Sequence, residues 1–185
     1  MANNYCQGSQ SWEFDDPKHR AWFEHQLDTV EVFWDDTDSI GWRQLTDQDR
    51  FNTEIYDAKL DKFNVDMIEI PRFRLDDLNL YEQNDDDSMS SCEFEYEISD
   101  KEIWFFGEEY INLEPVADLM HKFFKEHELH ETYFYMSTAS TCSKLRVEEF
   151  GGGACFVTSD GIDSFGTYSW IQEKIREFEN KAKGI

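Results

Sequence analysis

Three histidines near one predicted helix are the first candidates for chemistry. His121, His127 and His130 lie close to Glu126 and Glu128 in the chain, and imidazole together with carboxylate suits zinc or a similar ion. The spacing is unfavourable, because His121 and His127 fall about 240° apart on a helical wheel. Histidines near a helix C-terminus are also explained by the helix dipole alone. The pattern therefore keeps a metal-dependent enzyme as an alternative, and no metal site is predicted.

A cysteine and a run of glycines are the next candidates. Cys142 precedes Ser143 and Lys144, and a neighbouring cation can lower the pKa of a thiol and make it a nucleophile. A cysteine enzyme also needs a base and an oxyanion pocket, and no family signature surrounds this residue. Gly151-Gly152-Gly153 lacks the lysine and the following helix of a phosphate-binding loop. We expect a structural cysteine, glycines that serve a turn or bulge before a strand, no catalytic residue and no cofactor.

Carboxylates are the dominant chemical groups of the chain. Its 185 residues include 41 acidic and 17 basic side chains, which gives a net charge of -24. Half of this charge lies between residues 76 and 109, which hold thirteen acidic residues and one basic residue. Asp85-Asp86-Asp87 lacks the alternating ligands, central glycine and terminal glutamate of an EF-hand loop. Such a concentration of negative charge repels nucleic acids and membrane surfaces, and it attracts basic proteins or cations.

Part of this acidic region alternates between charged and apolar residues. Over residues 93–98 the alternation predicts a strand that buries Phe94, Tyr96 and Ile98 and turns its glutamates to solvent. Alternate residues on a strand lie about 6.6–6.8 Å apart, about twice the rise per phosphate along one DNA strand. Such a face can imitate nucleic acid in the binding cleft of a basic protein. The predicted partner-binding residues are Asp85, Asp86, Asp87, Glu93, Glu95, Glu97, Glu108 and Glu109.

Aromatic and cysteine content narrow the class of protein. With 16 Phe, 8 Tyr and 6 Trp the chain has too many large aromatic side chains for a disordered acidic segment. Its four cysteines form no Cys-x-x-Cys pair, which argues against a thiolate zinc site and predicts free thiols. The opening residues lack the basic start and apolar run of a signal peptide, and no apolar stretch reaches the ~20 residues that cross a bilayer. We therefore expect a cytoplasmic protein.

The first half of the chain predicts a strand, a helix and an irregular region. Residues 4–14 are typical of a strand, and Asp16-Pro17 provides an N-cap and a first-turn proline for a helix. This helix is expected to turn Ala21, Phe23, Leu27 and Val30 inward and to end near residues 32–34. Residues 35–90 form an acidic, partly irregular insertion, with a short helix over 53–62 and a strand over 63–70 that ends before a proline.

The second half predicts a more regular series of elements. A hairpin with its turn at residues 99–101 is followed by an amphipathic helix that Asn112 caps and that runs to about residue 128. Strands are expected over 133–136 and 154–158. A last helix is expected to turn inward the apolar residues Tyr168, Ile171, Ile175 and Phe178.

The order of these elements predicts one α+β domain over residues 1–185. The first six elements match a split βαβ, ferredoxin-like sandwich, with an antiparallel sheet and helices on one face. Residues 35–90 would be a long insertion within it. The remaining C-terminal strand and helix would extend the sheet.

Two short motifs add a resemblance to this expected fold. The opening residues 1–6, and residues 141–144 together with 149–153, resemble the YubB-type ferredoxin-like proteins of phages and bacterial mobile elements. The resemblance also covers the order of the elements and leaves the acidic region unmatched. It implies a ferredoxin-like fold and a phage-like origin, and it transfers no catalytic residue.

The concentrated negative charge, the aromatic core and the alternating pattern over residues 93–98 together predict a non-enzymatic acidic interaction protein. Its expected partner is a basic nucleic-acid-binding protein of a host, such as a restriction, CRISPR or repair factor or a DNA-binding regulator, whose nucleic-acid site it would occupy. Two alternatives stay open: a metal-dependent hydrolase that uses the His121–His130 region, and a soluble domain whose acidity serves only solubility. Binding to a basic partner with an affinity that falls steeply as salt rises would distinguish the acidic interaction protein from both alternatives.

Overall fold

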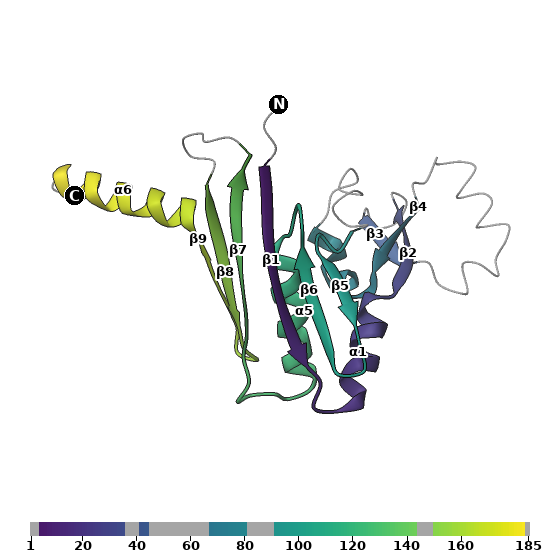
Figure 1. The fold of residues 1–185 in the computed structure, drawn as a ribbon. Coiled ribbons are helices and arrows are strands. Elements are labelled where there is room, and N and C mark those ends of the chain that lie inside the picture. The colour runs from purple at the N-terminus through teal and green to yellow at the C-terminus, as the bar shows by residue number, and fades with distance from the viewer. Residues whose placement is uncertain (1–3, 36–40, 45–66, 81–90, 144–149, 184–185) are drawn as a thin grey trace. The chain divides into compact units, whose positions relative to one another are not determined.

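The structure is a computed structural model that describes residues 4–35, 41–44, 67–80, 91–143 and 150–183 (Figure 1). Its contacts divide the chain into two compact units, Asp16–Cys92 and the combination of Met1–Asp15 with Glu93–Ile185. That residues 1–185 form one domain stays a prediction. The helix predicted over 53–62 and the acidic run Asp85-Asp86-Asp87 lie outside the described residues.

The unit Asp16–Cys92 contains a three-stranded antiparallel sheet in the order β3-β2-β4. Val30, Val32 and Ile70 form its buried cluster, and Ile68 and Leu75 pack against it. The proline predicted to stop a strand is the last residue of β4. The described elements of this unit are α1 (Pro17–Leu27), β2 (Thr29–Asp35), β3 (Gly41–Gln44), β4 (Met67–Pro71) and the 3-10 helix η1 (Arg72–Leu80).

Helix α1 begins as predicted and ends earlier than predicted. The side chain of Asp16 accepts a hydrogen bond from the Lys18 N–H at 2.9 Å, and Pro17 occupies the first turn. The helix ends at Leu27 and not near residues 32–34, since strand β2 begins at Thr29. The β-branched residues of β2 favour an extended backbone, which explains the correction.

The buried face of α1 also differs from the predicted one. Phe23 and Leu27 are buried as expected, but Ala21 is exposed. His19 and Gln26 are buried in its place. The apolar spacing identified the correct side of the helix, and it missed two polar residues on that side.

The unit Met1–Asp15 with Glu93–Ile185 is an α+β structure, compatible with a ferredoxin-like α+β fold. Its six-stranded sheet has the order β5-β6-β1-β7-β8-β9, and every neighbouring pair is antiparallel. The described elements of this unit are β1 (Asn4–Glu13), β5 (Glu95–Ile98), β6 (Glu102–Gly107), α5 (Leu113–Glu126), β7 (Phe134–Cys142), β8 (Gly151–Val157), β9 (Ile162–Gly166) and α6 (Thr167–Lys183).

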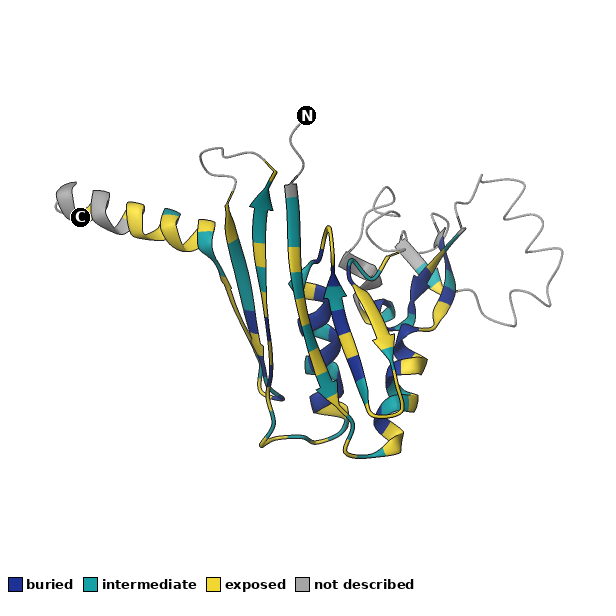
Figure 2. Cartoon of the chain, in the orientation of Figure 1, coloured by how far each residue is buried: buried dark blue, intermediate teal, exposed yellow. Residues whose placement is uncertain are grey.

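Helix α5 covers one face of this sheet, and most of the core lies between them (Figures 1 and 2). Trp12 of β1 meets Phe123 and Phe124 of α5 edge-on, with ring centroids 6.2 and 5.1 Å apart. The predicted cap is confirmed, because Asn112 Oδ1 accepts a hydrogen bond from the Glu114 N–H at 3.1 Å. We call the opposite side of the sheet the open face.

The β5–β6 hairpin confirms the predicted turn and corrects the predicted burial. At the turn, Ser99 Oγ accepts hydrogen bonds from the N–H groups of Lys101 and Glu102, both at 3.1 Å. Phe94 just before β5 is buried, whereas Tyr96, expected in the core, is 38% exposed. Because β5 is the edge strand of the sheet, a residue on its inner side has neighbours on one side only.

The three glycines lie within a strand and not in a turn before it. Strand β8 begins at Gly151, and Gly152 pairs with Ala139 of β7. A Cβ at Gly152 would collide with the backbone carbonyl oxygen of Thr138. The glycine therefore permits a close approach of two strands, and the turn prediction is wrong.

The C-terminal elements contain two further corrections. Strand β9 (Ile162–Gly166) was not predicted. In α6, Tyr168, Ile171 and Ile175 were expected to face inward, and all three are exposed. The side chain of Phe178 lies outside the described residues. Among the described helices, α6 included, we find none with the length and apolar character needed to cross a membrane.

Candidate functional site

Two of the predicted partner-binding glutamates share the open face with aromatic residues. Glu95 and Glu97 pair directly with Phe106 and Trp104 across the β5–β6 hairpin, so each pair projects to the same side of the sheet. Both glutamates are exposed. Trp104 is 38% exposed and stacks on Phe106, with ring centroids 4.3 Å apart. The arrangement places carboxylates beside an accessible aromatic surface.

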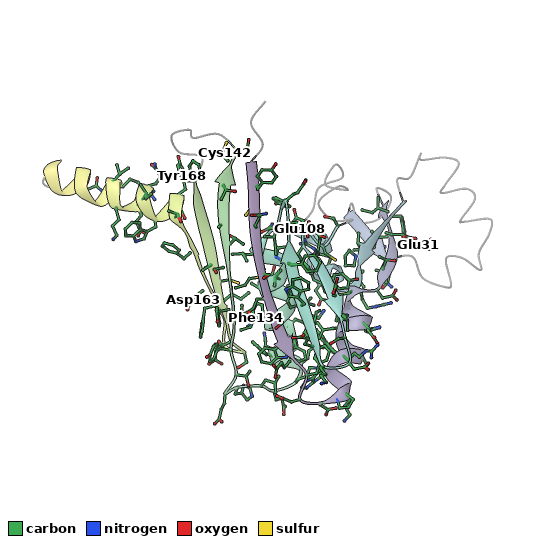
Figure 3. All side chains as sticks on the ribbon, viewed as in Figure 1. Glu31, Glu108, Phe134, Cys142, Asp163 and Tyr168 are labelled. Carbon is green, nitrogen blue, oxygen red and sulfur yellow. The ribbon has the colours of Figure 1, made fainter. Side chains whose placement is uncertain are left out.

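Two more predicted residues follow β6 directly. Glu108 and Glu109 are exposed, and their backbone is hydrogen-bonded to β1. Figure 3 labels Glu108. Gln7 Nε2 donates to the Glu108 carbonyl oxygen at 2.6 Å, and the Cys6 N–H donates to the Glu109 carbonyl oxygen at 2.9 Å. These bonds hold the segment by its backbone and leave both side chains at the surface. The carboxylate surface is defined as Glu95, Glu97, Glu108 and Glu109.

The segment that contains the carboxylate surface carries almost only negative charge. Residues 93–109 contain seven acidic residues and one basic residue, Lys101, which lies in the hairpin turn. Exposed carboxylates of one sign attract a cationic partner from a distance and repel phosphates. The attraction is screened by salt over about 8 Å at physiological ionic strength. Binding at this surface should therefore depend strongly on salt.

Glu93 does not belong to this surface. Strand β5 begins at Glu95, and Glu93 precedes it in the left-handed backbone region, with φ of 56°. Its Oε2 accepts a hydrogen bond from Asn112 Nδ2 at 3.0 Å, and its carbonyl oxygen accepts one from the Asn112 N–H at 2.8 Å. Because Asn112 caps α5, Glu93 supports the start of that helix. The prediction that Glu93 is part of the alternating strand is therefore wrong.

We expect substitution of Glu93 to affect stability differently from substitution of Glu95 and Glu97. Glu93→Ala should lower the free energy of unfolding by about 1 kcal/mol, because Asn112 loses a partly buried hydrogen bond. The double variant Glu95→Gln/Glu97→Gln should keep or raise the melting temperature, since it relieves repulsion between exposed like charges. Urea unfolding of the two variants makes the comparison. Equal destabilisation by both would contradict these roles.

The histidines each have a local structural role in this unit. His121 Nδ1 lies 2.7 Å from the Thr158 carbonyl oxygen, and His130 Nδ1 lies 3.1 Å from Ser159 Oγ. His127 packs against the ring of Phe123, with centroids 4.7 Å apart. His121 and His130 thus support the turn that follows β8. Within the described ranges there is no group of three or more His, Cys, Asp or Glu side chains placed to hold a metal ion.

A cavity of about 480 Å³ lies between α5 and strands β8 and β9. Its lining includes Glu114, Asp118, Cys155 and Ser164, and the described lining contains no histidine. Burial raises the pKa of the Cys155 thiol, although backbone hydrogen bonds oppose the rise. A thiol that burial keeps protonated is a poor nucleophile.

The other cysteines of the chain are Cys6, Cys92 and Cys142. All four cysteines are free thiols. Cys142 is half-buried at the end of β7, and Lys144, predicted to activate it, lies outside the described residues. Burial raises the pKa of Cys92 from 9.0 to about 11, and the nearby Arg74 opposes the rise only in part.

Slow alkylation of Cys92 is the expected consequence. At pH 8 the thiol should be protonated in the folded protein, and its reaction with iodoacetamide should be at least about tenfold slower than in urea. The rate should increase with pH up to about 11, since the thiolate forms only there. Peptide mapping after timed alkylation measures this directly. A rate for Cys92 equal in folded and denatured protein would contradict the burial of its thiol.

The aromatic part of the open face was not predicted as part of the site. Trp104 and Phe106 were assigned to a strand, but not to its outer side. Their positions alternate with Ile103 and Phe105, which are fully buried. Residues 103–106 are all apolar, so the sequence of β6 does not separate its two sides, and the pairing of Trp104 and Phe106 with exposed glutamates of β5 does.

Comparison with known proteins adds no family to this description. No protein-family model matches the chain, and no curated protein or solved structure matches it either.

Proposed function

We propose that this chain is an acidic, non-enzymatic interaction protein that binds a basic nucleic-acid-binding protein of a host in place of its nucleic acid. The observation that carries the proposal is the open face of β5–β6. There, exposed Glu95 and Glu97 pair across the strands with Phe106 and Trp104. Alternating carboxylates imitate a row of phosphates, and the adjoining rings imitate stacked bases.

The chemistry of this surface suits arginine and lysine. A guanidinium group can be bound by a carboxylate and can also lie over an aromatic ring, as it does over bases in nucleic-acid complexes. A cation over Trp104 would contribute about 0.5–1 kcal/mol at an exposed site. Opposite charges mainly accelerate association and select the partner. The partner class is therefore a protein with a basic cleft for DNA or RNA.

We further propose that the fold is a split βαβ, ferredoxin-like sandwich with an insertion. In chain order β1, α1, β5, β6, α5 and β7 would form the split βαβ plan, with residues 35–90 as its acidic insertion. Strands β8 and β9 and helix α6 would extend it. The resemblance of residues 1–6, 141–144 and 149–153 to YubB-type proteins supports a phage origin. Such an origin fits a cytoplasmic protein that blocks a host defence or regulatory factor.

Capture of a basic partner tests the proposed function. The immobilised chain is incubated with the heparin-binding fraction of a host lysate at about 50 mM and again at about 500 mM salt. We expect capture at low salt and its loss at high salt. The variant Glu95→Gln/Glu97→Gln/Glu108→Gln/Glu109→Gln should capture at least about tenfold less, because each lost charge contact weakens both steering and contact.

A charge-matched control separates the carboxylate surface from net acidity. Four exposed acidic residues of the same unit that lie outside this surface, Asp15, Glu126, Glu131 and Asp160, can be changed to uncharged amides with the same change in net charge. The control variant should capture the partner as the natural chain does. Equal loss in both variants would show that acidity serves only solubility and general attraction.

A further inference from the structure

In the part of helix α6 whose side chains the structure describes, the large apolar residues are exposed. The helix spans the 17 residues Thr167–Lys183, and Figure 1 shows it leading away from the sheet after β9. Tyr168, Ile171 and Ile175 are 69%, 42% and 45% exposed. Helices in proteins gain most of their stability from packing an apolar face against another surface. The exposed apolar residues of α6 therefore need a partner surface.

The first turn of α6 is fixed to its own sheet, so the helix is presented in a defined direction. Thr167 Oγ1 donates to the Gly152 carbonyl oxygen at 3.0 Å, and Ser169 Oγ donates to the Gly166 carbonyl oxygen at 2.9 Å. The Trp170 ring lies 6.4 Å from that of Phe165. These contacts anchor the N-terminal end of α6. They leave the face that carries Ile171 and Ile175 exposed.

The spacing on the exposed face is that of a coiled-coil seam. Tyr168, Ile171 and Ile175 are separated by three and four residues, and the sequence continues the pattern at positions 178 and 182 with Phe and Ala. Alternating steps of three and four give a 3.5-residue period, which keeps the seam toward a second helix. A helix that packs on the outside of a globular core more often has a wider apolar stripe.

Charge favours a second copy of the same helix. Within a chain of net charge -24, the α6 sequence holds four basic and three acidic residues, so two copies can meet here without repulsion. In the heptad that starts at Tyr168, Lys174 occupies position g and Glu179 occupies the following position e. In a parallel pair, position g of one helix lies beside the following position e of the other helix, so these opposite charges favour a parallel pair. An antiparallel pair would instead bring lysines of the two helices together.

We propose that α6 joins two copies of this chain in a parallel helix pair with Tyr168, Ile171 and Ile175 at its seam. The surface is distinct from the carboxylate surface. Its binding is apolar, so added salt should not weaken it, in contrast to capture of a basic partner.

Mass measurement by light scattering after size exclusion tests the proposal. The natural chain should elute as a dimer of twice its 22.1 kDa mass. The variant Ile171→Glu/Ile175→Glu should be a monomer, with the dissociation constant raised at least about 100-fold. The control Arg176→Glu places the same charge on α6 outside the seam and should remain a dimer.

Hydrogen exchange shows whether the seam variant is a folded monomer or a misfolded chain. In the Ile171→Glu/Ile175→Glu variant, amides of α6 should lose protection while those of α5 keep it. A natural chain that stays at 22.1 kDa at every concentration would overturn the proposal. So would a seam variant that dimerises as well as the natural chain.

Discussion

Phe105→Ala is expected to lower the free energy of unfolding by about 3–5 kcal/mol, the largest stability effect we expect from a single substitution in this chain. Phe105 is fully buried in the middle of β6. Its ring meets Phe94 and Phe134 edge-on, with centroids 5.6 and 5.8 Å apart. Truncation would leave a cavity among groups that belong to three separate segments of the chain. Urea unfolding followed by tryptophan fluorescence gives the difference.

Tyr96→Ala is the matched control for this substitution. Tyr96 is the direct cross-strand partner of Phe105, but it is 38% exposed at the edge of the sheet. The loss should be clearly smaller, on the order of 1–2 kcal/mol, since less apolar area leaves the core. Equal losses for the two variants would mean that β5 packs as an inner strand, contrary to the observed sheet order.

Gly152→Ala should produce the second largest effect, a loss of about 1–3 kcal/mol from overpacking. The added methyl would meet the Thr138 carbonyl oxygen of the adjacent strand β7. A backbone atom of a paired strand cannot move aside as a flexible side chain can, so β7 and β8 would have to separate. Thermal unfolding should show a lower melting temperature.

Gly151→Ala provides the control one residue away. A Cβ there would lie 3.8 Å from the Thr167 Cβ, which is ordinary van der Waals contact. We expect little change or a small gain in stability, because alanine restricts the unfolded chain more than glycine does. Destabilisation by Gly151→Ala as large as that by Gly152→Ala would indicate a general need for glycine in this strand.

Local signals in the sequence predicted many element boundaries correctly. Asp16 and Asn112 cap helices where their side chains were expected to, and Pro71 ends β4. Each of these effects depends on one or two neighbouring residues. The strong apolar period of α5 is of the same kind, since the helix alone determines which residues share a face.

Features that depend on tertiary pairing were not predicted. The exposure of Tyr96 follows from the edge position of β5, and the need for Gly152 follows from its distance to Thr138. Neither is visible in local composition. In α6 the helical spacing of the apolar residues was recognised. Spacing alone does not determine whether these residues pack on their own chain or stay exposed.

The candidate site was predicted in part for the same reason. Alternation identified Glu95 and Glu97 as exposed, and the structure places them so. The same alternation included Glu93, which a positive φ and two hydrogen bonds to Asn112 remove from the strand. The aromatic neighbours Trp104 and Phe106 became part of the surface only once the register of β5 and β6 was known.

Competition with duplex DNA is the most direct test of the central claim. A basic protein captured by the immobilised chain at about 50 mM salt is challenged with increasing duplex DNA, while the same DNA is tested for binding to the chain alone. If the carboxylate surface occupies a nucleic-acid site, DNA should release the captured protein and should not bind the chain itself. A captured protein that holds DNA and the chain together would contradict the account.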